Sequence, residues 1–145
     1  MNKKVIFVLG IIAGFVFTFL NGFIFENKNV KLKDSIYAIN SEVVKINEVV
    51  PFNWDTVYYI EPYTSKEEIQ DIIGIENVKI TDNNISEGFV YLVFVKGNSV
   101  VTVLKGYPDN IGYDIRFKDK VNYSDDVSFN VIKDKNIIVL EKAGS

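Results

Sequence analysis

Carboxylates and tyrosines are the side chains best suited to chemistry in this chain, because its 145 residues include no histidine and no cysteine. The usual zinc and copper ligands are therefore missing, and so are the Ser-His and Cys-His pairs of nucleophilic enzymes. The chemistry left is acid–base catalysis by two carboxyl groups, which in glycoside hydrolases lie about 5–9.5 Å apart. Asp55 and Asp114 form the first pair to test for it.

An aromatic and acidic cluster, FNWDTVYYIEPY, lies at residues 52–63. Aromatic residues are enriched in recognition surfaces, so Trp54, Asp55, Tyr58 and Tyr63 are candidate binding residues. The alternative is a structural use. In a strand, Trp54 and Tyr58 would point the same way and pack beneath a helix, while Asp55 would cap a turn or accept a hydrogen bond. The structural use is the more common one, and both remain open at this point.

A second candidate surface is the loop from Tyr107 to Tyr113, which carries a tyrosine at each end. Loops with exposed aromatic residues often bind partners, and the alternative is that these tyrosines cover the edge of a sheet. The only arginine, Arg116, would have a structural role if it were buried against Asp55 or Asp114.

No metal site, cofactor or nucleic-acid partner is predicted. The turns at 82–84, 109–110 and 125–126 are rich in Asp and Asn, but they lack the twelve-residue calcium loop with its terminal glutamate. The carboxylates at 67–71 indicate the solvated face of a helix. Nucleic-acid-binding proteins usually carry a basic patch, whereas this chain has a formal net charge of −3 and no cluster of Lys and Arg.

The run Val5–Phe25, VIFVLGIIAGFVFTFLNGFIF, contains no charged residue. About 20 apolar residues in a helix span the hydrocarbon core of a bilayer. A backbone in lipid must be helical, because it finds no hydrogen-bond partner in the solvent. The run therefore predicts a single-pass transmembrane helix, and it makes the membrane the first predicted partner of the chain.

Two fates compete for this run. Lys3 and Lys4 form the short positive region of a signal sequence, but the run exceeds the apolar length of about 7–15 residues typical of a cleaved signal, and no A-x-A-like site follows it. We expect an uncleaved signal anchor in the cell membrane, with the N-terminus inside and the domain outside the cytoplasm. The alternative is a secreted protein that cleavage releases.

The chain divides into three predicted parts. These are the signal-anchor helix at 1–25, a polar juxtamembrane spacer at 26–33, and a single extracytoplasmic domain at 34–145.

Two helices are predicted in the domain. Apolar residues three and four apart predict the first helix over 34–46, and its buried stripe would be Ile36, Ile39, Val43 and Ile46. The capping-box pair Ser65 and Glu68 begins the second helix, and Gly74 ends it. Its buried stripe would be Ile69, Ile72 and Ile73.

Alternating residues and turn signals predict the strands. The runs concerned are 54–60, 77–81, 88–96, 99–104, 112–117, 127–132 and 137–140. Long parallel crossovers are missing between most of them. The predicted fold class is therefore α+β, with a mainly antiparallel sheet of five to seven strands and about two helices packed on one face.

The motif F-x-W-D-x-V-Y at 52–58, followed by Pro62-Tyr63 and by the S-x-x-E capping box, resembles that of small extracytoplasmic proteins of low-GC bacteria. Many members of that group are lipoproteins or single-span proteins without an assigned activity. The resemblance covers about residues 52–117 and implies location and fold only. The chain departs from the lipoprotein members because it has no cysteine to carry a lipid.

These observations favour a membrane-anchored extracytoplasmic domain that contacts a protein partner and has no catalytic activity. Immunity-type protection, inhibition of a secreted hydrolase and envelope assembly fit equally, and the partner is unknown. One alternative is a hydrolase that uses carboxylates alone, with Asp55 and Asp114 as its pair. The other is a sensor of small ligands, which would need an apolar pocket between helix and sheet.

Overall fold

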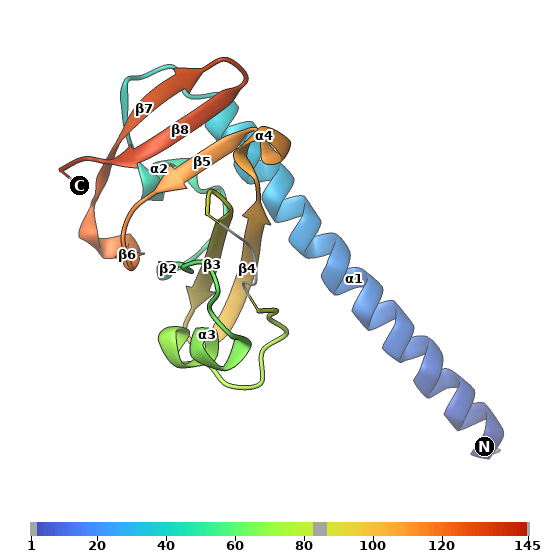
Figure 1. Cartoon of the computed structure of the whole chain (residues 1–145). Coiled ribbons are helices and arrows are strands. Elements are labelled where there is room, and N and C mark those ends of the chain that lie inside the picture. The colour runs from blue at the N-terminus through green and yellow to red at the C-terminus, as the bar shows by residue number, and fades with distance from the viewer. Residues whose placement is uncertain (1–2, 83–86, 145) are drawn as a thin grey trace.

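The computed structural model describes residues 3–82 and 87–144, apart from the side chains of 3–10, 15 and 21–26. Eight strands lie in this described part, in two four-stranded sheets, and one long helix runs beside them (Figure 1). The α+β class and the mainly antiparallel pairing are confirmed. The single sheet of five to seven strands is wrong, because the period-two pattern identifies strands but not the sheet that each strand joins.

The first sheet has the strand order β1-β7-β8-β5. Its strands are β1 (Val43–Lys45), β5 (Tyr113–Arg116), β7 (Ser128–Asp134) and β8 (Ile137–Lys142). The predicted β7–β8 hairpin is confirmed. β5 pairs parallel to β8, with Tyr113 opposite Ile138, and it reaches β8 through the connection that contains β6 and β7.

The second sheet has the strand order β4-β3-β2-β6. Its strands are β2 (Thr56–Tyr59), β3 (Val90–Lys96), β4 (Ser99–Gly106) and β6 (Lys120–Asn122). The predicted β3–β4 hairpin is confirmed, and its turn uses Gly97 with a left-handed φ of +54°. The strand expected at 77–81 does not form, and Asn77 has a φ of +56°, in the left-handed region and outside that of regular strands. The turn expected at 82–84 lies mostly outside the described residues.

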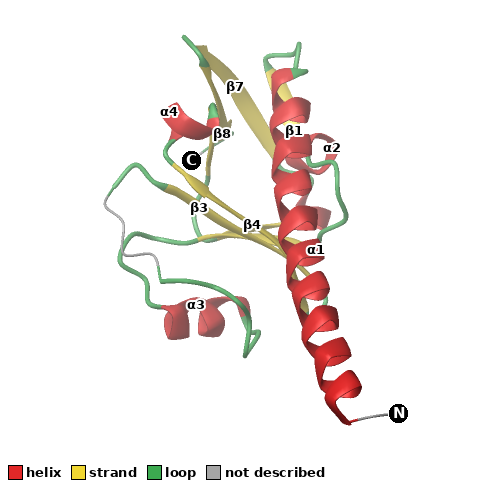
Figure 2. Ribbon diagram, turned by 90° about the vertical axis from the view of Figure 1, so that its right-hand side faces the viewer, coloured by secondary structure: helices red, strands yellow, loops and turns green. Residues whose placement is uncertain are grey.

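Helices cover the second sheet on two different sides (Figure 2). Helix α3 (Lys66–Ile73) packs Ile69 and Ile73 on the outer face of the sheet. Helix α1 (Lys3–Tyr37) places Leu32 and Ile36 in the main core, which lies between the two sheets. The prediction that both helices share one face is therefore wrong. Cover on both faces also explains why six consecutive β3 residues are buried.

The predicted limits of α3 are confirmed. The Ser65 hydroxyl accepts a hydrogen bond from the Glu68 N–H at 3.2 Å, and the Ser65 N–H donates to the Glu68 carboxylate at 2.8 Å. Gly74 closes the helix with a φ of +70°, a conformation that glycine adopts without a steric penalty. The buried stripe is confirmed for Ile69 and Ile73 but not for Ile72, which is 48% exposed on the outward side of this short helix.

The separate helix predicted over 34–46 is wrong, because α1 continues through Asp34 and ends at Tyr37. Val43 begins strand β1 and is 52% exposed, while Ile36 and Ile46 are buried as expected. Val and Ile are β-branched and favour strands, so the helical spacing was misleading here. The remaining short helices are α2 (Ile46–Val49), α4 (Pro108–Ile111) and a 3-10 helix (Tyr123–Asp125).

Helix α1 covers the outer edge of β4. The Lys28 ammonium donates to the Val101 carbonyl at 2.9 Å, and the Asn29 amide donates to the Val103 carbonyl at 3.2 Å. These bonds satisfy carbonyls that an edge strand would otherwise leave unpaired. Leu32 follows on the same helix and is fully buried. Residues within 26–33 therefore form part of the folded core.

The backbone of the run Val5–Phe25 lies within helix α1. In the part of the chain that is described, no helix has the length and apolar content required to cross a bilayer. Several side chains of the run, at 5–10, 15 and 21–25, are outside that part.

Candidate functional site

Trp54 belongs to the main core and not to a surface. Its side chain is 3% exposed, and its ring packs edge-to-face on Phe94 at 5.9 Å and on Tyr123 at 5.3 Å. Tyr58 instead contacts the other core cluster, beneath α3. The expectation that both residues pack beneath the second helix is confirmed for Tyr58 and wrong for Trp54, because Trp54 precedes β2 and does not follow the alternation of the strand.

Asp55 has a structural role at the β3–β4 turn. Its carboxylate accepts a hydrogen bond from the Gly97 N–H at 2.7 Å. Asp114 lies on β5 in the other sheet, is 8% exposed, and accepts a hydrogen bond from the Arg116 guanidinium at 2.6 Å. Asp55 precedes β2, Asp114 lines a cavity with Tyr59 at the other end of that strand, and each carboxylate has its own hydrogen-bond partner. Arg116 has the predicted partner Asp114 and not Asp55.

The loop at 107–113 supplies one exposed tyrosine and not two. Tyr107 is 38% exposed, and its ring packs edge-to-face on Phe89 at 5.1 Å. Tyr113 is 2% exposed, and its burial raises the pKa of the hydroxyl well above the ordinary value. The expected recognition role of Tyr113 is wrong, because Tyr113 is the first residue of β5 and its side chain is buried in the core.

Tyr58 and Tyr63 do come together, in a cleft of about 820 Å³ between the end of β2, helix α3 and the start of β6. We call it the β2–α3 cleft. Its polar and aromatic lining comes from Tyr58, Tyr59, Glu61, Tyr63, Thr64, Glu68, Asp71, Asp119 and Lys120. The pairing of β2 with β6 places Tyr58 opposite Lys120 and thereby joins the two sides of the cleft.

The β2–α3 cleft is acidic. Four carboxylates line it against one ammonium group, that of Lys120, whose Nζ lies 6.0 Å from the centre of the Tyr58 ring. The hydrogen bonds that Ser65 donates hold the pKa of Glu68 below its ordinary value, so this carboxylate is ionised at neutral pH. The cleft therefore attracts positive charge.

Two residues of the cleft have an unusual backbone. Tyr63 has a φ of +65° and Asp119 a φ of +55°, in the left-handed region that costs energy for residues other than glycine. Local hydrogen bonds hold both: the Thr64 hydroxyl donates to the Glu61 carbonyl at 2.7 Å, and the Tyr59 N–H donates to the Asp119 carbonyl at 2.9 Å. The strained geometry leaves Tyr63 69% exposed at the edge of the cleft.

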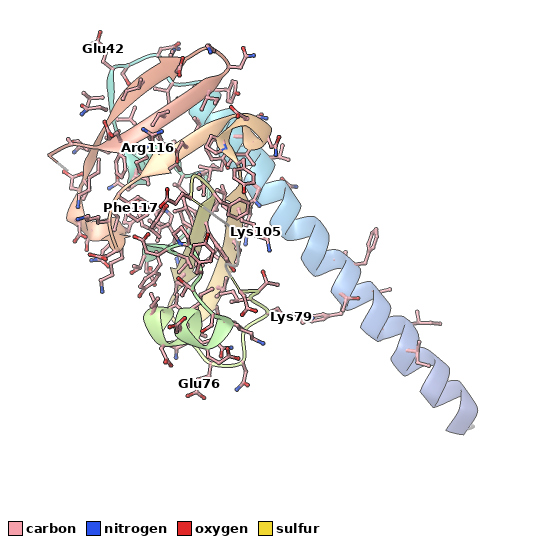
Figure 3. All side chains as sticks on the ribbon, in the orientation of Figure 1. Glu42, Glu76, Lys79, Lys105, Arg116 and Phe117 are labelled. Atoms are coloured by element: carbon pink, nitrogen blue, oxygen red, sulfur yellow. The ribbon has the colours of Figure 1, made fainter. Side chains whose placement is uncertain are left out.

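A smaller cavity of about 320 Å³ adjoins the cleft and shares Tyr59 and Glu61 with it. Asp114, Arg116 and Phe117 also line this cavity, and Figure 3 labels Arg116 and Phe117. Burial, followed by the nearby carboxylates, raises the pKa of Tyr59 above its ordinary value. The Tyr59 hydroxyl therefore stays protonated and can donate a hydrogen bond into this cavity at neutral pH.

Sequence reasoning identified Tyr58 and Tyr63 but missed Asp119 and Lys120. No local signal marks those two residues, because β6 has only three residues and reaches the cleft through pairing with β2. Within the described residues, no group of three or more His, Cys, Asp or Glu side chains is placed to hold a metal ion.

Comparison with protein-family models, curated proteins and solved structures finds no match to this chain.

Proposed function

We propose that this chain is a membrane-anchored, extracytoplasmic interaction domain that binds a basic segment of a partner protein through the β2–α3 cleft and does so without catalysis. The observation that carries the proposal is the cleft itself, which is lined by four carboxylates, three tyrosines and one lysine. Immunity, inhibition of a secreted hydrolase and envelope assembly fit a protein-contact role equally.

The chemistry of the cleft supports a protein partner. Tyrosines contribute large contact area at a low cost in side-chain entropy, and Tyr63 is exposed enough to provide it. Carboxylates at the edge of an interface select and steer a partner of opposite charge. Asp55 and Asp114 accept hydrogen bonds from different partners, Gly97 and Arg116, which favours structural roles for both carboxylates.

The run Val5–Phe25 supports the membrane anchor. It contains no charged residue, and its described large side chains are exposed, as in Ile12, Phe17 and Phe19, which are 53%, 69% and 79% exposed. Exposed apolar side chains on several sides of one helix are typical of a helix whose solvent is lipid. The short positive N-terminus favours the orientation with the domain outside the cytoplasm.

The location is tested by treating intact cells with protease after a tag is added to the C-terminus. The expected result is loss of the tag, with the untreated chain in the membrane fraction at its full-length mass, because the anchor is not cleaved. A tag that is protected until the cells are lysed would place the domain in the cytoplasm. A shorter mass in the medium would indicate the secreted alternative.

Binding by the cleft is tested with the full chain in nanodiscs of zwitterionic lipid and with a lysine- and arginine-rich peptide as probe. The double variant Asp71→Asn/Asp119→Asn should weaken binding about two- to thirtyfold, since exposed ion pairs each contribute modestly. Asparagine tolerates the left-handed backbone at position 119, so the fold should be retained. Isothermal titration calorimetry measures the change.

The matched control is Glu42→Gln/Asp134→Asn, which removes the same charge from exposed positions of the first sheet and the segment before it. It should leave the affinity within about twofold, because screening weakens distant exposed charges at 0.15 M salt. Equal weakening by both double variants would show attraction by net charge alone and would contradict a specific cleft.

A further inference from the structure

The small cavity beside the β2–α3 cleft is formed by residues of both sheets, and we call it the Tyr59–Asp114 cavity. Tyr59 is the last residue of β2 and Glu61 follows it, whereas Asp114 and Arg116 belong to β5 of the first sheet. Figure 3 shows Arg116 and Phe117 at the end of β5. Its volume of about 320 Å³ is at the lower end of the range for ligand pockets, so it suits a single side chain and not a length of peptide.

Asp114 is the buried charge of this cavity. The residue is 8% exposed, and the Arg116 guanidinium donates to one oxygen of its carboxylate at 2.6 Å. In the part of the chain that the structure describes, the other oxygen has no donor, and it is not sealed from solvent, so a ligand in the cavity can reach it. A largely buried acceptor without a donor is costly. A ligand that donates a hydrogen bond at this position is therefore favoured.

The charges around the cavity favour a cation. Two carboxylates, those of Glu61 and Asp114, line it together with one guanidinium, that of Arg116, and this leaves a net negative charge. Burial and then both carboxylates raise the pKa of the Tyr59 hydroxyl, while the guanidinium acts in the opposite direction, so all three charges lie near this hydroxyl. A protonated tyrosine can donate to a carboxylate and at the same time accept a hydrogen bond from a ligand.

The rest of the wall is apolar and comes from Phe89, Val90 and Phe117, all of which are buried. A cavity with an apolar wall and a negatively charged group complements a side chain that has an apolar stem and a positive end. Lysine and arginine both have this form.

The bond between Arg116 and Asp114 favours lysine over arginine as the ligand. A guanidinium binds a carboxylate best through two parallel hydrogen bonds, which need both carboxylate oxygens. Arg116 already occupies one of the two Asp114 oxygens. An ammonium group is a compact charge with rotatable donors, so one carboxylate oxygen and one neighbouring hydroxyl are enough to bind it.

We propose that the Tyr59–Asp114 cavity binds one lysine side chain of the basic partner segment. The ammonium donates to the remaining Asp114 oxygen and to the Tyr59 hydroxyl, and the stem lies on the apolar wall. The cleft and the cavity share Tyr59 and Glu61, so a segment in the cleft can place a side chain in the cavity. The inference rests on the function proposed above and adds to it a selectivity for lysine over arginine.

The test compares three peptides of equal charge on the full chain in nanodiscs of zwitterionic lipid. The probes are octalysine, octaarginine, and octalysine with trimethylated side chains, which keep their charge but have no N–H to donate. Attraction by the acidic cleft acts on all three peptides. Isothermal titration calorimetry should give octalysine an affinity about fivefold or more above the other two, as expected for a hydrogen bond to a charged group that only the ammonium makes well.

Two variants assign this preference to the cavity. Asp114→Asn should weaken octalysine binding roughly tenfold or more and abolish the preference, because the asparagine oxygen still accepts from Arg116 but the charge is lost. Tyr59→Phe removes only the hydroxyl and should weaken octalysine binding about two- to tenfold. It tests the cavity even if the Asp114 variant does not fold, which circular dichroism checks for each variant.

The matched control is Asp134→Asn, which removes the same charge from an exposed position of β7. It should leave all three affinities within about twofold, because salt screens distant exposed charges.

The outcomes separate the cavity from the cleft. Equal affinities for the three peptides, or a lysine preference that both cavity variants retain, overturns the lysine site. The cleft proposal then still stands if Asp71→Asn/Asp119→Asn weakens all three peptides. Tighter binding of the trimethylated peptide would overturn the lysine site in favour of an aromatic site for quaternary ammonium groups. Failure of all three peptides to bind would overturn the basic partner and the lysine site together.

Discussion

Replacing Phe94 with alanine is expected to lower the free energy of unfolding by about 3–5 kcal/mol, the usual cost of removing a buried aromatic ring. Phe94 is fully buried at the centre of β3. Its ring packs edge-to-face on Phe52 at 5.1 Å and on Trp54 at 5.9 Å, contacts that add to the burial of the ring. Alanine would leave a cavity between the two sheets that these neighbours fill only in part.

Urea unfolding of the full chain in detergent micelles, followed by circular dichroism, measures this change. The fluorescence of Trp54 is less suitable for this variant, because the mutated ring touches it. Phe19→Ala is the control, since that ring is 79% exposed on α1, and it should change the free energy by about 0.5 kcal/mol or less. A loss below about 1 kcal/mol for Phe94→Ala would contradict the placement of Phe94 in the core.

Leu32→Ala is expected to lower the free energy of unfolding by about 2–5 kcal/mol, as for other buried leucines. Leu32 lies in the stretch that reads as a polar spacer, but its side chain is fully buried in the main core beside Ile36. The prediction therefore tests whether α1 is part of the domain or only its link to the membrane. A fragment that begins at Asp34 would lack this side chain altogether.

Trp54 is the only tryptophan and is 3% exposed, so its fluorescence reports the unfolding of the Leu32 variant directly. Val30→Ala is the matched control, because Val30 lies on the same helix and is 53% exposed. It should cost about 0.5 kcal/mol or less. Equal costs for the two variants would mean that the helix does not pack its Leu32 face on the sheets.

The features that the sequence predicted well depend on short-range interactions. The capping box of Ser65 and Glu68 and the terminal Gly74 define α3 within ten consecutive positions. The β3–β4 hairpin follows from two apolar runs on either side of Gly97 and its neighbour Asn98. In each case the residues that determine the structure are adjacent in the chain.

The features that could not be predicted depend on distant pairings. Val44 joins the first sheet through Phe129, and no local pattern reveals a partner that far along the chain. The isoleucine and valine spacing around Val43 favours a helix, the β-branched side chains themselves favour a strand, and the tertiary pairing decides for the strand. Strands of three residues, such as β1 and β6, are too short for periodicity to detect.

The candidate site shows the same division. Tyr58 and Tyr63 were recognised because they lie in one aromatic cluster, and they do share the cleft. Trp54 and Tyr113 belong to the core. Their burial could not be predicted, because composition alone does not reveal which face of a strand is covered. Asp119 contributes to the cleft only because β6 pairs with β2.

Helix α1 passes from the run of the proposed anchor into the core without a break. Each residue of an α-helix turns the chain by about 100° and advances it about 1.5 Å. One residue added before Lys28 would therefore rotate the whole domain by about 100° about the anchor axis, whereas seven added residues would restore its orientation to within about 20° and raise it by about 10 Å. The length of this helix thus sets the direction in which the β2–α3 cleft points along the cell surface and its height above it.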